Sequence, residues 1–285
     1  MKGIVLAGGS GTRLYPITIS VSKQLLPVYD KPMIYYPISV LMQAGIQDIL
    51  IISTPEDTPK MQKALGNGKN FGINLSYKIQ ESPDGIAQSF IIAEEFIAES
   101  SVCLILGDNI FYGSTFEKQI KNAFALKNGG VIFGYRVSDP QRYGVVDLDE
   151  DGKVRSIVEK PKEFISNYAV TGLYFYDNTV VEKAKTLKPS ARGELEITDI
   201  HNLYLDEQKL RLEILEHGTA WLDAGTFESL LDASHYVQVI EKRQGIKIAC
   251  LEEIALANGW ISRDFLHSSL PTKSKNSYFD YLLKL

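Results

Sequence analysis

The residues best suited to chemistry begin with a glycine-rich segment, Gly8-Gly9-Ser10-Gly11-Thr12-Arg13, which directly follows a short apolar run. Glycine leaves backbone N–H groups uncovered, so a turn of this kind can hold an anion. Thr12 and Arg13 add a hydroxyl and a guanidinium, and both groups bind phosphate oxygens. The segment therefore predicts a phosphate-binding loop, with a plain turn between a strand and a helix as its alternative.

The spacing separates this loop from two other nucleotide-binding loops. Leu14 stands where the G-x-G-x-x-G pattern of dinucleotide-binding folds needs its third glycine, which disfavours a nicotinamide-dependent oxidoreductase. The sequence also contains no G-x-x-x-x-G-K-[ST] segment, so a P-loop is excluded. A phosphate-binding loop of another kind remains.

Asp108 and Asp223 are the candidate metal ligands, because each closely follows an apolar, strand-like run. Open α/β sheets bind ligands at the carboxyl ends of their strands. Mg²⁺ prefers one or two carboxylates together with phosphate oxygens and water. We therefore expect the two aspartates to hold Mg²⁺, although each one alone is also typical of a turn or a helix N-cap.

The elements that must position these residues alternate regularly as far as Gly134. Strands are expected at residues 4–7, 49–52, 75–79, 102–106 and 131–133, and helices at 32–44, 56–65, 86–97 and 116–126. This alternation predicts an α/β fold with a mainly parallel, Rossmann-like mixed sheet that helices cover on both faces.

The pattern changes after Gly134. An Asp151-Gly152 turn between two apolar runs predicts a β-hairpin, and a further strand is expected at 170–176. We interpret this part as a smaller β lobe inserted into the fold. Helices at 196–207 and 227–242 and a helical C-terminal tail complete one domain over residues 1–285, with parts at about 1–134, 135–226 and 227–285.

Composition excludes several classes of protein. The chain has 285 residues, of which 45% are hydrophobic, and a formal net charge of −5, so it is a poor candidate for binding nucleic acid. No apolar run reaches the ~18 residues of a membrane helix. Residues 1–4 lead into a strand-like run and not into a signal peptide. The two cysteines and four histidines show no zinc spacing, and Cys103 and Cys250 are expected in the core. We expect a cytoplasmic protein without nucleic-acid or membrane partners.

Eight segments spread over nearly the whole chain carry a more specific pattern. They are Gly8–Pro16, Ser22–Met33, Gln80–Gln88, Leu106–Asn109, Arg142–Val145, Val158–Pro161, Arg192–Asp199 and Ala220–Thr226. Together they resemble the sugar nucleotidyltransferases. The glycine motif alone is shared by all nucleotidyltransferases of this fold, and the full set is far more specific.

The resemblance implies a reaction between a nucleoside triphosphate and a sugar 1-phosphate that releases pyrophosphate. It implies direct, Mg²⁺-dependent attack of the sugar phosphate on the α-phosphorus, with dTTP and α-D-glucose 1-phosphate as substrates. UTP in place of dTTP is the close alternative. A regulatory homologue without activity is disfavoured, because such a protein should have lost the charged site residues, and this chain keeps them.

The resemblance also implies a role for individual residues. The catalytic residues are Arg13, Lys23, Asp108, Lys160 and Asp223. Among them, Asp108 and Asp223 are the metal pair. The nucleotide-binding residues are Gly8, Gly9, Ser10, Gly11, Thr12, Arg13, Lys23, Gln24, Gln80, Pro83, Gly85 and Asp108. The residues for the sugar phosphate are Asn109, Tyr143, Gly144, Glu159, Lys160, Val170, Tyr174, Arg192 and Trp221. For Tyr143 and Tyr174, core packing is the alternative.

Within these sets, the resemblance assigns Arg13 and Lys23 to the triphosphate, and Lys160 and Arg192 to the sugar phosphate. A glutamine amide offers donors and an acceptor together, so Gln80 fits the edge of thymine or uracil. The resemblance further implies a homotetramer, a first step in dTDP-deoxysugar (dTDP-rhamnose) synthesis and feedback inhibition by dTDP-rhamnose at a subunit interface. No motif points to residues for that second site.

Overall fold

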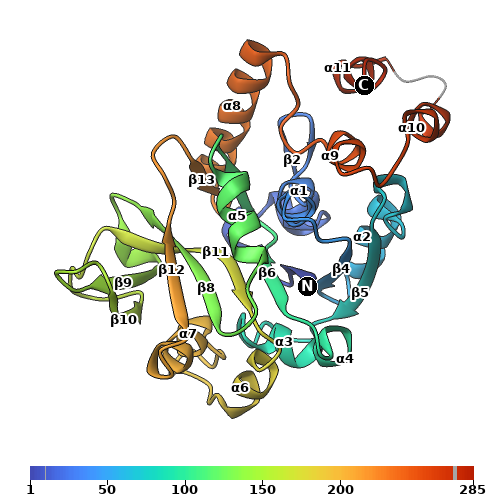
Figure 1. Cartoon of the computed structure of the whole chain (residues 1–285). Coiled ribbons are helices and arrows are strands. Elements are labelled where there is room, and N and C mark those ends of the chain that lie inside the picture. The colour runs from blue at the N-terminus through green and yellow to red at the C-terminus, as the bar shows by residue number, and fades with distance from the viewer. Residues whose placement is uncertain (10, 272–274) are drawn as a thin grey trace.

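The computed structural model describes residues 1–9, 11–271 and 275–285, and in these ranges nine strands form one central sheet. Figure 1 shows the strands running through the middle of the molecule. They are β1 (Lys2–Ala7), β4 (Asp48–Ser53), β5 (Asn74–Ile79), β6 (Val102–Leu106), β8 (Gly130–Arg136), β9 (Gly144–Leu148), β10 (Val154–Glu159), β11 (Tyr168–Tyr176) and β12 (Leu210–Ile214).

The sheet combines a parallel part with a part made mainly of antiparallel pairs, in which β12 runs parallel to its neighbour β8. Its order is β10-β9-β11-β6-β1-β4-β5, and β8 pairs with both β11 and β12. β6, β1, β4 and β5 are parallel neighbours, whereas β11 runs antiparallel to β6, β8 and β9. The predicted mixed α/β sheet, with a parallel first part and a β-hairpin lobe after Gly134, is therefore confirmed.

Strand register brings the candidate residues to one edge of the sheet. Leu6 on β1 lies opposite Ile52 on β4 and Leu106 on β6. The carboxyl ends of β1 and β6 are thus level, and the segments that follow them lie side by side. The glycine-rich loop begins at one of these ends and Asp108 at the other.

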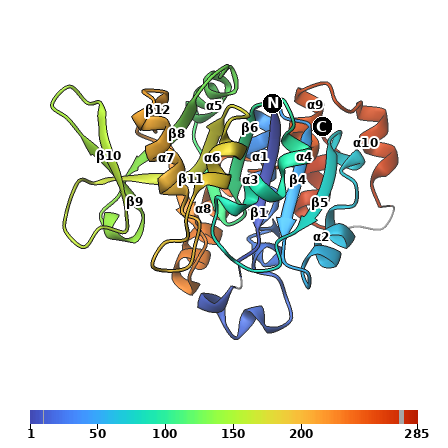
Figure 2. The same cartoon turned by 90° about the horizontal axis from the view of Figure 1, so that it is seen from below.

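Helices cover both faces of the sheet, as Figures 1 and 2 show. Buried side chains of α1 (Tyr35–Gln43), α2 (Thr58–Leu65), α5 (Phe116–Phe124) and α9 (Leu251–Ala257) form one core layer. Those of α3 (Gln88–Ile92), α4 (Glu94–Ile97), α6 (Val180–Thr186) and α7 (Ile197–Asp206) form the opposite layer. The sheet is therefore buried on both sides, as its nearly continuous apolar strands require.

Two small antiparallel sheets lie outside the central one. β7 (Asn109–Tyr112) pairs with β13 (Ala220–Asp223), and β2 (Pro27–Val28) pairs with β3 (Lys31–Pro32). After β13 the chain enters the long helix α8 (Phe227–Gln244), whose first turn has a capping box between Thr226 and Ser229. Helices α10 (Arg263–Ser269) and α11 (Ser277–Leu282) belong to the tail.

Several element boundaries differ from the sequence-based expectation. The helix expected from Pro32 begins at Tyr35, because Pro32 pairs with Pro27 in the β2–β3 sheet. The helix expected at 86–97 is divided into α3 and α4, since the backbone at Ala93 leaves helical angles (φ −88°, ψ 3°). The strands β7 and β12 and the helix α6 were not expected at all, whereas β13 contains the strand-like run expected before Asp223.

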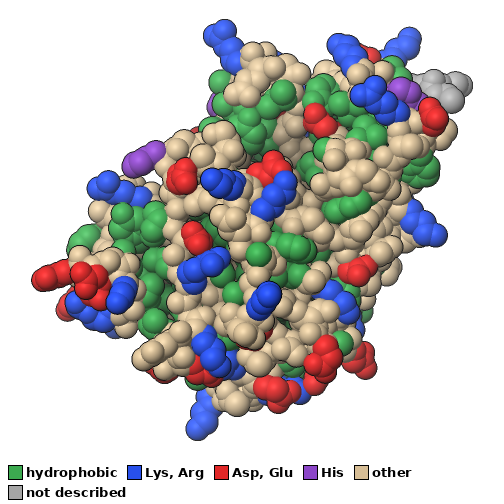
Figure 3. Space-filling view, in the orientation of Figure 1, with side chains coloured by type: hydrophobic (Ala, Val, Ile, Leu, Met, Phe, Trp, Pro, Cys, Tyr) green, Lys and Arg blue, Asp and Glu red, His purple; other side chains and the backbone are tan. Residues whose placement is uncertain are grey.

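The β9–β10 hairpin projects from one end of the sheet, opposite to the end formed by β5 (Figure 2). Its turn contains Gly152 at φ 77°, a conformation that favours glycine. Acidic and basic side chains are interspersed over the face seen in Figure 3. Within the described ranges, every helix is too short or too polar to cross a bilayer.

Candidate active site

A cavity of about 330 Å³ lies at the carboxyl ends of β1 and β6. Its walls include all described residues that the sequence predicted for nucleotide binding, and Ser10 lies outside the described residues. They are Gly8, Gly9, Gly11, Thr12, Arg13, Lys23, Gln24, Gln80, Pro83, Gly85 and Asp108. Residues from four separate segments of the chain are thus brought together around one space.

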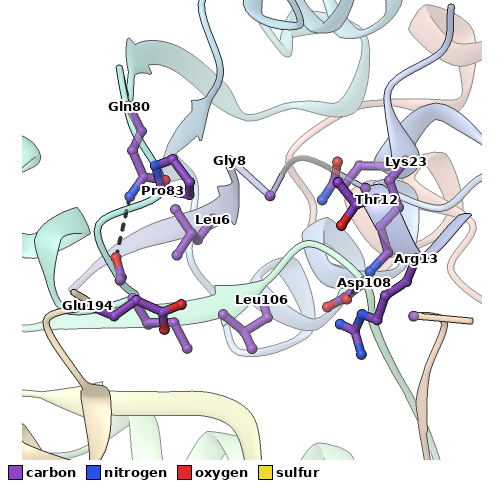
Figure 4. Close-up of a pocket in the computed structure, with 16 residues that line it drawn as sticks. Leu6, Gly8, Thr12, Arg13, Lys23, Gln80, Pro83, Leu106, Asp108 and Glu194 are labelled. Carbon is purple, nitrogen blue, oxygen red and sulfur yellow. Dashed lines mark hydrogen bonds and ion pairs between the residues drawn. The ribbon is translucent and has the colours of Figure 1, made fainter. Parts of the chain in front are cut away.

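The two ends of this cavity differ in chemistry, as Figure 4 shows. Gln80 and Pro83 lie at one end, and Arg13, Lys23 and Asp108 lie at the other, with Gly8 between them. One end therefore offers an amide and the other offers positive charge. This is the division that a molecule with a polar ring at one end and phosphates at the other requires.

The Gln80 side chain is buried and held in place by its neighbours. Its Nε2 atom donates to Oε1 of Gln88 at 2.6 Å and to the carbonyl of Gly85 at 3.3 Å. A Cβ atom on Gly8 would lie only 2.1 Å from Oε1 of Gln80. Gly8 is therefore required to be glycine for the amide to keep this position.

The cationic end is built from two short 3₁₀ turns. Arg13 lies in the turn Thr12–Leu14, and its guanidinium packs against Gly225, where an added Cβ would be 3.4 Å away. Lys23 lies in the turn Lys23–Leu25, is buried, and places Nζ in contact with Oδ2 of Asp108. Both cations thus face the carboxylate that follows β6.

Asp108 and Asp223 are held close together by the β7–β13 pair. Asp223 lies opposite Asn109 in this pair, and the N–H of Ala224 donates to the carbonyl of Asp108 at 3.0 Å. Asp223 therefore comes from the small sheet and not from a strand of the central sheet. The backbone alone brings two carboxylates, which are far apart in the sequence, to one place.

The two carboxyl groups have opposite pKa shifts. Burial would raise the pKa of Asp108, but the Lys23 charge and hydrogen bonds from Lys23 and Asn109 outweigh it, so the pKa lies below its usual value. For Asp223, burial raises the pKa, and the nearby charge of Asp108 adds to this effect. The attraction of Arg142 and Arg13 does not compensate, so the pKa of Asp223 lies above its usual value.

This donor set fits a magnesium ion that shares its shell with a substrate. Mg²⁺ is bound in proteins by one or two carboxylates together with phosphate oxygens and water. Asp108 and Asp223 supply two carboxylates, and in the described parts of the chain no group of three or more acidic, histidine or cysteine side chains could hold a metal by itself. A metal here would need further oxygens from a bound phosphate.

A second cavity of about 520 Å³ adjoins the first, and Arg13 and Asp108 line both. Its walls include Asp223 and all residues that the sequence predicted for the sugar phosphate. They are Asn109, Tyr143, Gly144, Glu159, Lys160, Val170, Tyr174, Arg192 and Trp221. Most of these come from the hairpin lobe and from β11.

Charged groups alternate along one wall of the second cavity. Arg192 Nη2 lies 2.7 Å from a carboxylate oxygen of Glu196 and 3.3 Å from oxygens of Glu159 and Glu194. Glu159 Oε2 also accepts a 2.8 Å hydrogen bond from Thr198 Oγ1. These contacts fix Glu159 as an acceptor that faces the cavity.

Lys160 has an unusual backbone. Its φ of 42° lies in the left-handed region, which is uncommon for a residue with a Cβ and costs of order 1–3 kcal/mol. The Lys160 N–H donates to the carbonyl of Tyr143 at 3.0 Å, and this hydrogen bond holds both residues next to each other at the cavity. Strained conformations of this kind are concentrated at functional sites.

Asn109 connects Asp108 to the aromatic wall of the second cavity. Its Oδ1 accepts from Trp221 Nε1 at 2.7 Å and from the N–H of Gly172 at 3.0 Å, and its Nδ2 donates to Asp108 at 2.9 Å. The ring of Tyr143 lies 5.1 Å from the indole of Trp221. The Asn109 amide oxygen therefore accepts two hydrogen bonds from protein groups while the amide nitrogen donates to Asp108, so this side chain orients the residues around it.

Sequence reasoning missed several residues that line the second cavity. Arg142 directly precedes Tyr143, and Glu194 lies two positions after Arg192, in segments that carry the resemblance. Both could therefore have been predicted as site residues. His201 had no such signal, because a single histidine on a helix is usually a packing residue. The structure places His201 at the cavity with both ring nitrogens buried and without a hydrogen-bond partner among the described residues.

The chain is similar to known nucleotidyl transferases over most of its length. The family described as nucleotidyl transferase matches residues 2–239. A glucose-1-phosphate thymidylyltransferase from Neisseria meningitidis is 59% identical over 285 residues, covering 100% of this chain and 99% of that protein. One from Mycolicibacterium smegmatis is 55% identical with the same coverage. A crystal structure from Bacillus anthracis, of a provisionally assigned glucose-1-phosphate thymidylyltransferase in complex with sucrose, is 44% identical with a TM-score of 0.77, covering 83% of this chain and 94% of that one. The chain therefore belongs to the nucleotidyl transferase family.

Proposed function

We propose that the protein transfers the thymidylyl group of dTTP to α-D-glucose 1-phosphate, giving dTDP-glucose and pyrophosphate. The observation that carries this proposal is the pair of adjoining cavities with Arg13 and Asp108 in their shared wall. One suits a nucleoside triphosphate and the other suits a sugar phosphate. The names of the full-length relatives support this choice of substrates.

The base would bind at the amide end of the first cavity. The Gln80 Oε1 atom would accept from the N3–H of a pyrimidine, since Nε2 already donates to Gln88 and to the Gly85 carbonyl. Uracil carries the same N3–H as thymine, so this contact suits both dTTP and UTP. The preference for dTTP over UTP is supported by the relatives' names.

The sugar phosphate is itself the nucleophile in this reaction. One of its oxygens forms a bond to the α-phosphorus while the bond from that phosphorus to the bridging oxygen breaks, and pyrophosphate leaves with the electron pair. The attacking monoester is already anionic at neutral pH, so no protein base has to remove a proton. Positioning and charge neutralisation therefore carry the catalysis.

The cations of the two cavities would neutralise different substrates. Arg13 and Lys23 would neutralise the triphosphate, while Lys160 and Arg192 would hold the sugar phosphate against it. A Mg²⁺ ion held by Asp108 and Asp223 would supply further charge neutralisation on the phosphates. Transfer in one step inverts the configuration at the α-phosphorus.

The test is pyrophosphate release from glucose 1-phosphate with dTTP, UTP, CTP, ATP and GTP in turn. We expect release with dTTP that depends on the sugar phosphate. Faster release with UTP would make the protein a uridylyltransferase, and release without any sugar phosphate would contradict the proposal. Asp108→Asn should lower the rate about 10²-fold or more, as does the loss of one preorganised charge-stabilising group. The matched control Asp48→Asn alters an exposed carboxylate at the far end of β4.

The stereochemical course separates direct transfer from a covalent intermediate. We expect inversion with an α-phosphorothioate analogue of dTTP. Retention, or nucleotide trapped on the denatured protein in the absence of sugar phosphate, would require a protein nucleophile.

The family resemblance also supports a homotetramer that acts at the first step of dTDP-rhamnose synthesis and is inhibited by dTDP-rhamnose. Light scattering on the purified protein tests the assembly. Inhibition of pyrophosphate release by dTDP-rhamnose tests the feedback.

A further inference from the structure

Both carboxylates of the metal pair are paired with a cation of the protein. Lys23 Nζ contacts Oδ2 of Asp108, and Arg142 Nη2 lies 3.4 Å from Oδ2 of Asp223. An arriving divalent ion would meet carboxylates whose charge is already balanced. It would also be repelled by the two cations that balance them.

The two cations differ in their freedom to move. The Lys23 side chain is 8% exposed, so it is enclosed beside Asp108. The Arg142 side chain is 43% exposed and closes the short turn Pro140–Arg142 at the edge of the second cavity. Arg142 can therefore leave Asp223 without disturbing the core.

A second carboxylate and an aromatic ring keep Arg142 at this position. Its Nη1 lies 2.9 Å from Oδ2 of Asp139, and its guanidinium carbon lies 5.4 Å from the centre of the Tyr143 ring. The guanidinium therefore bridges Asp139 and Asp223. If it left Asp223, it would still be held by Asp139 next to the cavity.

We propose that Arg142 acts as an internal counter-ion of Asp223 that keeps divalent metal from binding until a triphosphate arrives. This proposal rests on the proposed function, because it takes Asp108 and Asp223 as the metal pair. The triphosphate brings several negative charges that neutralise Lys23 and Arg13 in the first cavity and attract Arg142, in the adjoining cavity, away from Asp223. It also brings the oxygens that two carboxylates alone cannot supply. Metal and triphosphate therefore bind cooperatively, and each raises the affinity of the other by the same factor.

The experiment uses Mn²⁺ as the probe and the full chain, with electron paramagnetic resonance reporting free Mn²⁺. The wild type should bind Mn²⁺ weakly alone and tightly with α,β-methylene dTTP, an analogue that cannot transfer its nucleotidyl group. In Arg142→Gln, Mn²⁺ alone should bind about tenfold more tightly, because a positive charge next to the site is removed. The coupling between metal and analogue should decrease accordingly.

The control variant is Arg155→Gln. Arg155 also pairs with an aspartate, with Nη1 3.6 Å from Oδ2 of Asp147, but it lies on β10 and lines neither cavity. Its replacement should leave Mn²⁺ affinity unchanged. An increase in Mn²⁺ affinity in Arg155→Gln as large as that in Arg142→Gln would reduce the effect to net charge and overturn the proposal.

A double variant separates this proposal from the proposed function. In Asp223→Asn, the additional Arg142→Gln change should no longer increase Mn²⁺ affinity, because the carboxylate that Arg142 neutralises is gone. Equal Mn²⁺ affinity in wild type and Arg142→Gln would overturn the counter-ion proposal while leaving thymidylyl transfer intact. Failure of the proposed function would appear separately, as the absence of dTTP-dependent pyrophosphate release in the wild type.

Discussion

Trp221 Nε1 donates a 2.7 Å hydrogen bond to Oδ1 of Asn109, although the two residues lie 112 positions apart. The same asparagine donates to Asp108 from the other side of its amide. One buried side chain thus links the aromatic wall of the second cavity to the metal pair. Its contribution can be measured separately from that of any charged group.

Replacing Asn109 with Leu should destabilise the protein and lower its activity. The indole N–H of Trp221 and the backbone N–H of Gly172 would lose their acceptor, and each unpaired buried donor costs about 1–3 kcal/mol. Urea unfolding measures the loss. Asn74→Leu is the control, since Asn74 is exposed and its side-chain amide bonds only to Asp48 among the contacts described. Equal stability of the two variants would contradict the role of Asn109.

Neutralising the two metal-pair carboxylates should change stability in opposite directions. The pKa of Asp223 is raised, so its charge is unfavourable in the folded protein, and Asp223→Asn should raise the melting temperature at pH 7. The pKa of Asp108 is lowered, so its charge is favourable, and Asp108→Asn should lower the melting temperature. Both variants should lose activity.

The pH dependence of the melting temperature tests these opposite effects of Asp108 and Asp223. As pH falls through the raised pKa of Asp223, the native carboxylate takes up a proton, and the advantage of Asp223→Asn should disappear. The stability that Asp108 provides is complete above its unfolded pKa and is lost as pH falls through its lower folded pKa. Thermal melts between pH 8 and pH 3 measure both effects, and shifts of the same sign at pH 7 would refute the assignment.

His201 should make the protein sensitive to mild acid. Burial lowers its pKa from 6.5 to about 3, so between these values the unfolded chain binds a proton that the folded chain does not. Stability should therefore fall by about 1.4 kcal/mol for each pH unit below 6.5. His201→Phe, which keeps a ring beside Tyr174 and Tyr176, should remove this part of the slope.

The control for this prediction is His217→Gln, which changes an exposed histidine. Its unfolding free energy should follow the wild-type pH dependence between pH 7 and pH 5. If His201→Phe and His217→Gln had the same slope as the wild type, the acid sensitivity would have to come from carboxylates alone.

Gly8→Ala should act on nucleotide binding through Gln80. The new Cβ would occupy the space of Oε1 of Gln80 and force the amide away, so the KM for dTTP should rise. Gln80→Ala should raise it as well. In the double variant the two effects should be clearly less than additive, because both remove the same contact. Full additivity in steady-state kinetics would show that Gly8 acts independently of Gln80.

Much of the first cavity could be predicted from the sequence, because its residues follow buried strands. The glycine-rich loop comes directly after β1 and Asp108 comes shortly after β6, and such runs identify strand ends without any structure. Parallel pairing then requires these ends to meet. Local patterns were sufficient here, since the strands themselves define the edge.

The second cavity depends on contacts that local patterns do not encode. Asp223 reaches Asp108 only through the pairing of β13 with β7, and neither β7 nor this pairing was expected. Arg192 was recognised by resemblance, but the three glutamates around it come from two separate segments. The burial of His201 depends on Tyr174 and Tyr176 of β11, which lie more than 20 positions away along the chain.

Strand β11 has a further consequence for the reaction. It pairs with β6 along Tyr174 opposite Leu104, so the strand that precedes Asp108 and the strand that carries Tyr174 belong to one continuous hydrogen-bonded surface. The two cavities therefore cannot move apart as hinged halves without breaking that surface. Under the proposed function, the sheet would therefore limit how far apart the nucleotide and the sugar phosphate can bind. A sugar that carries its phosphate on a longer arm should then be a poorer acceptor.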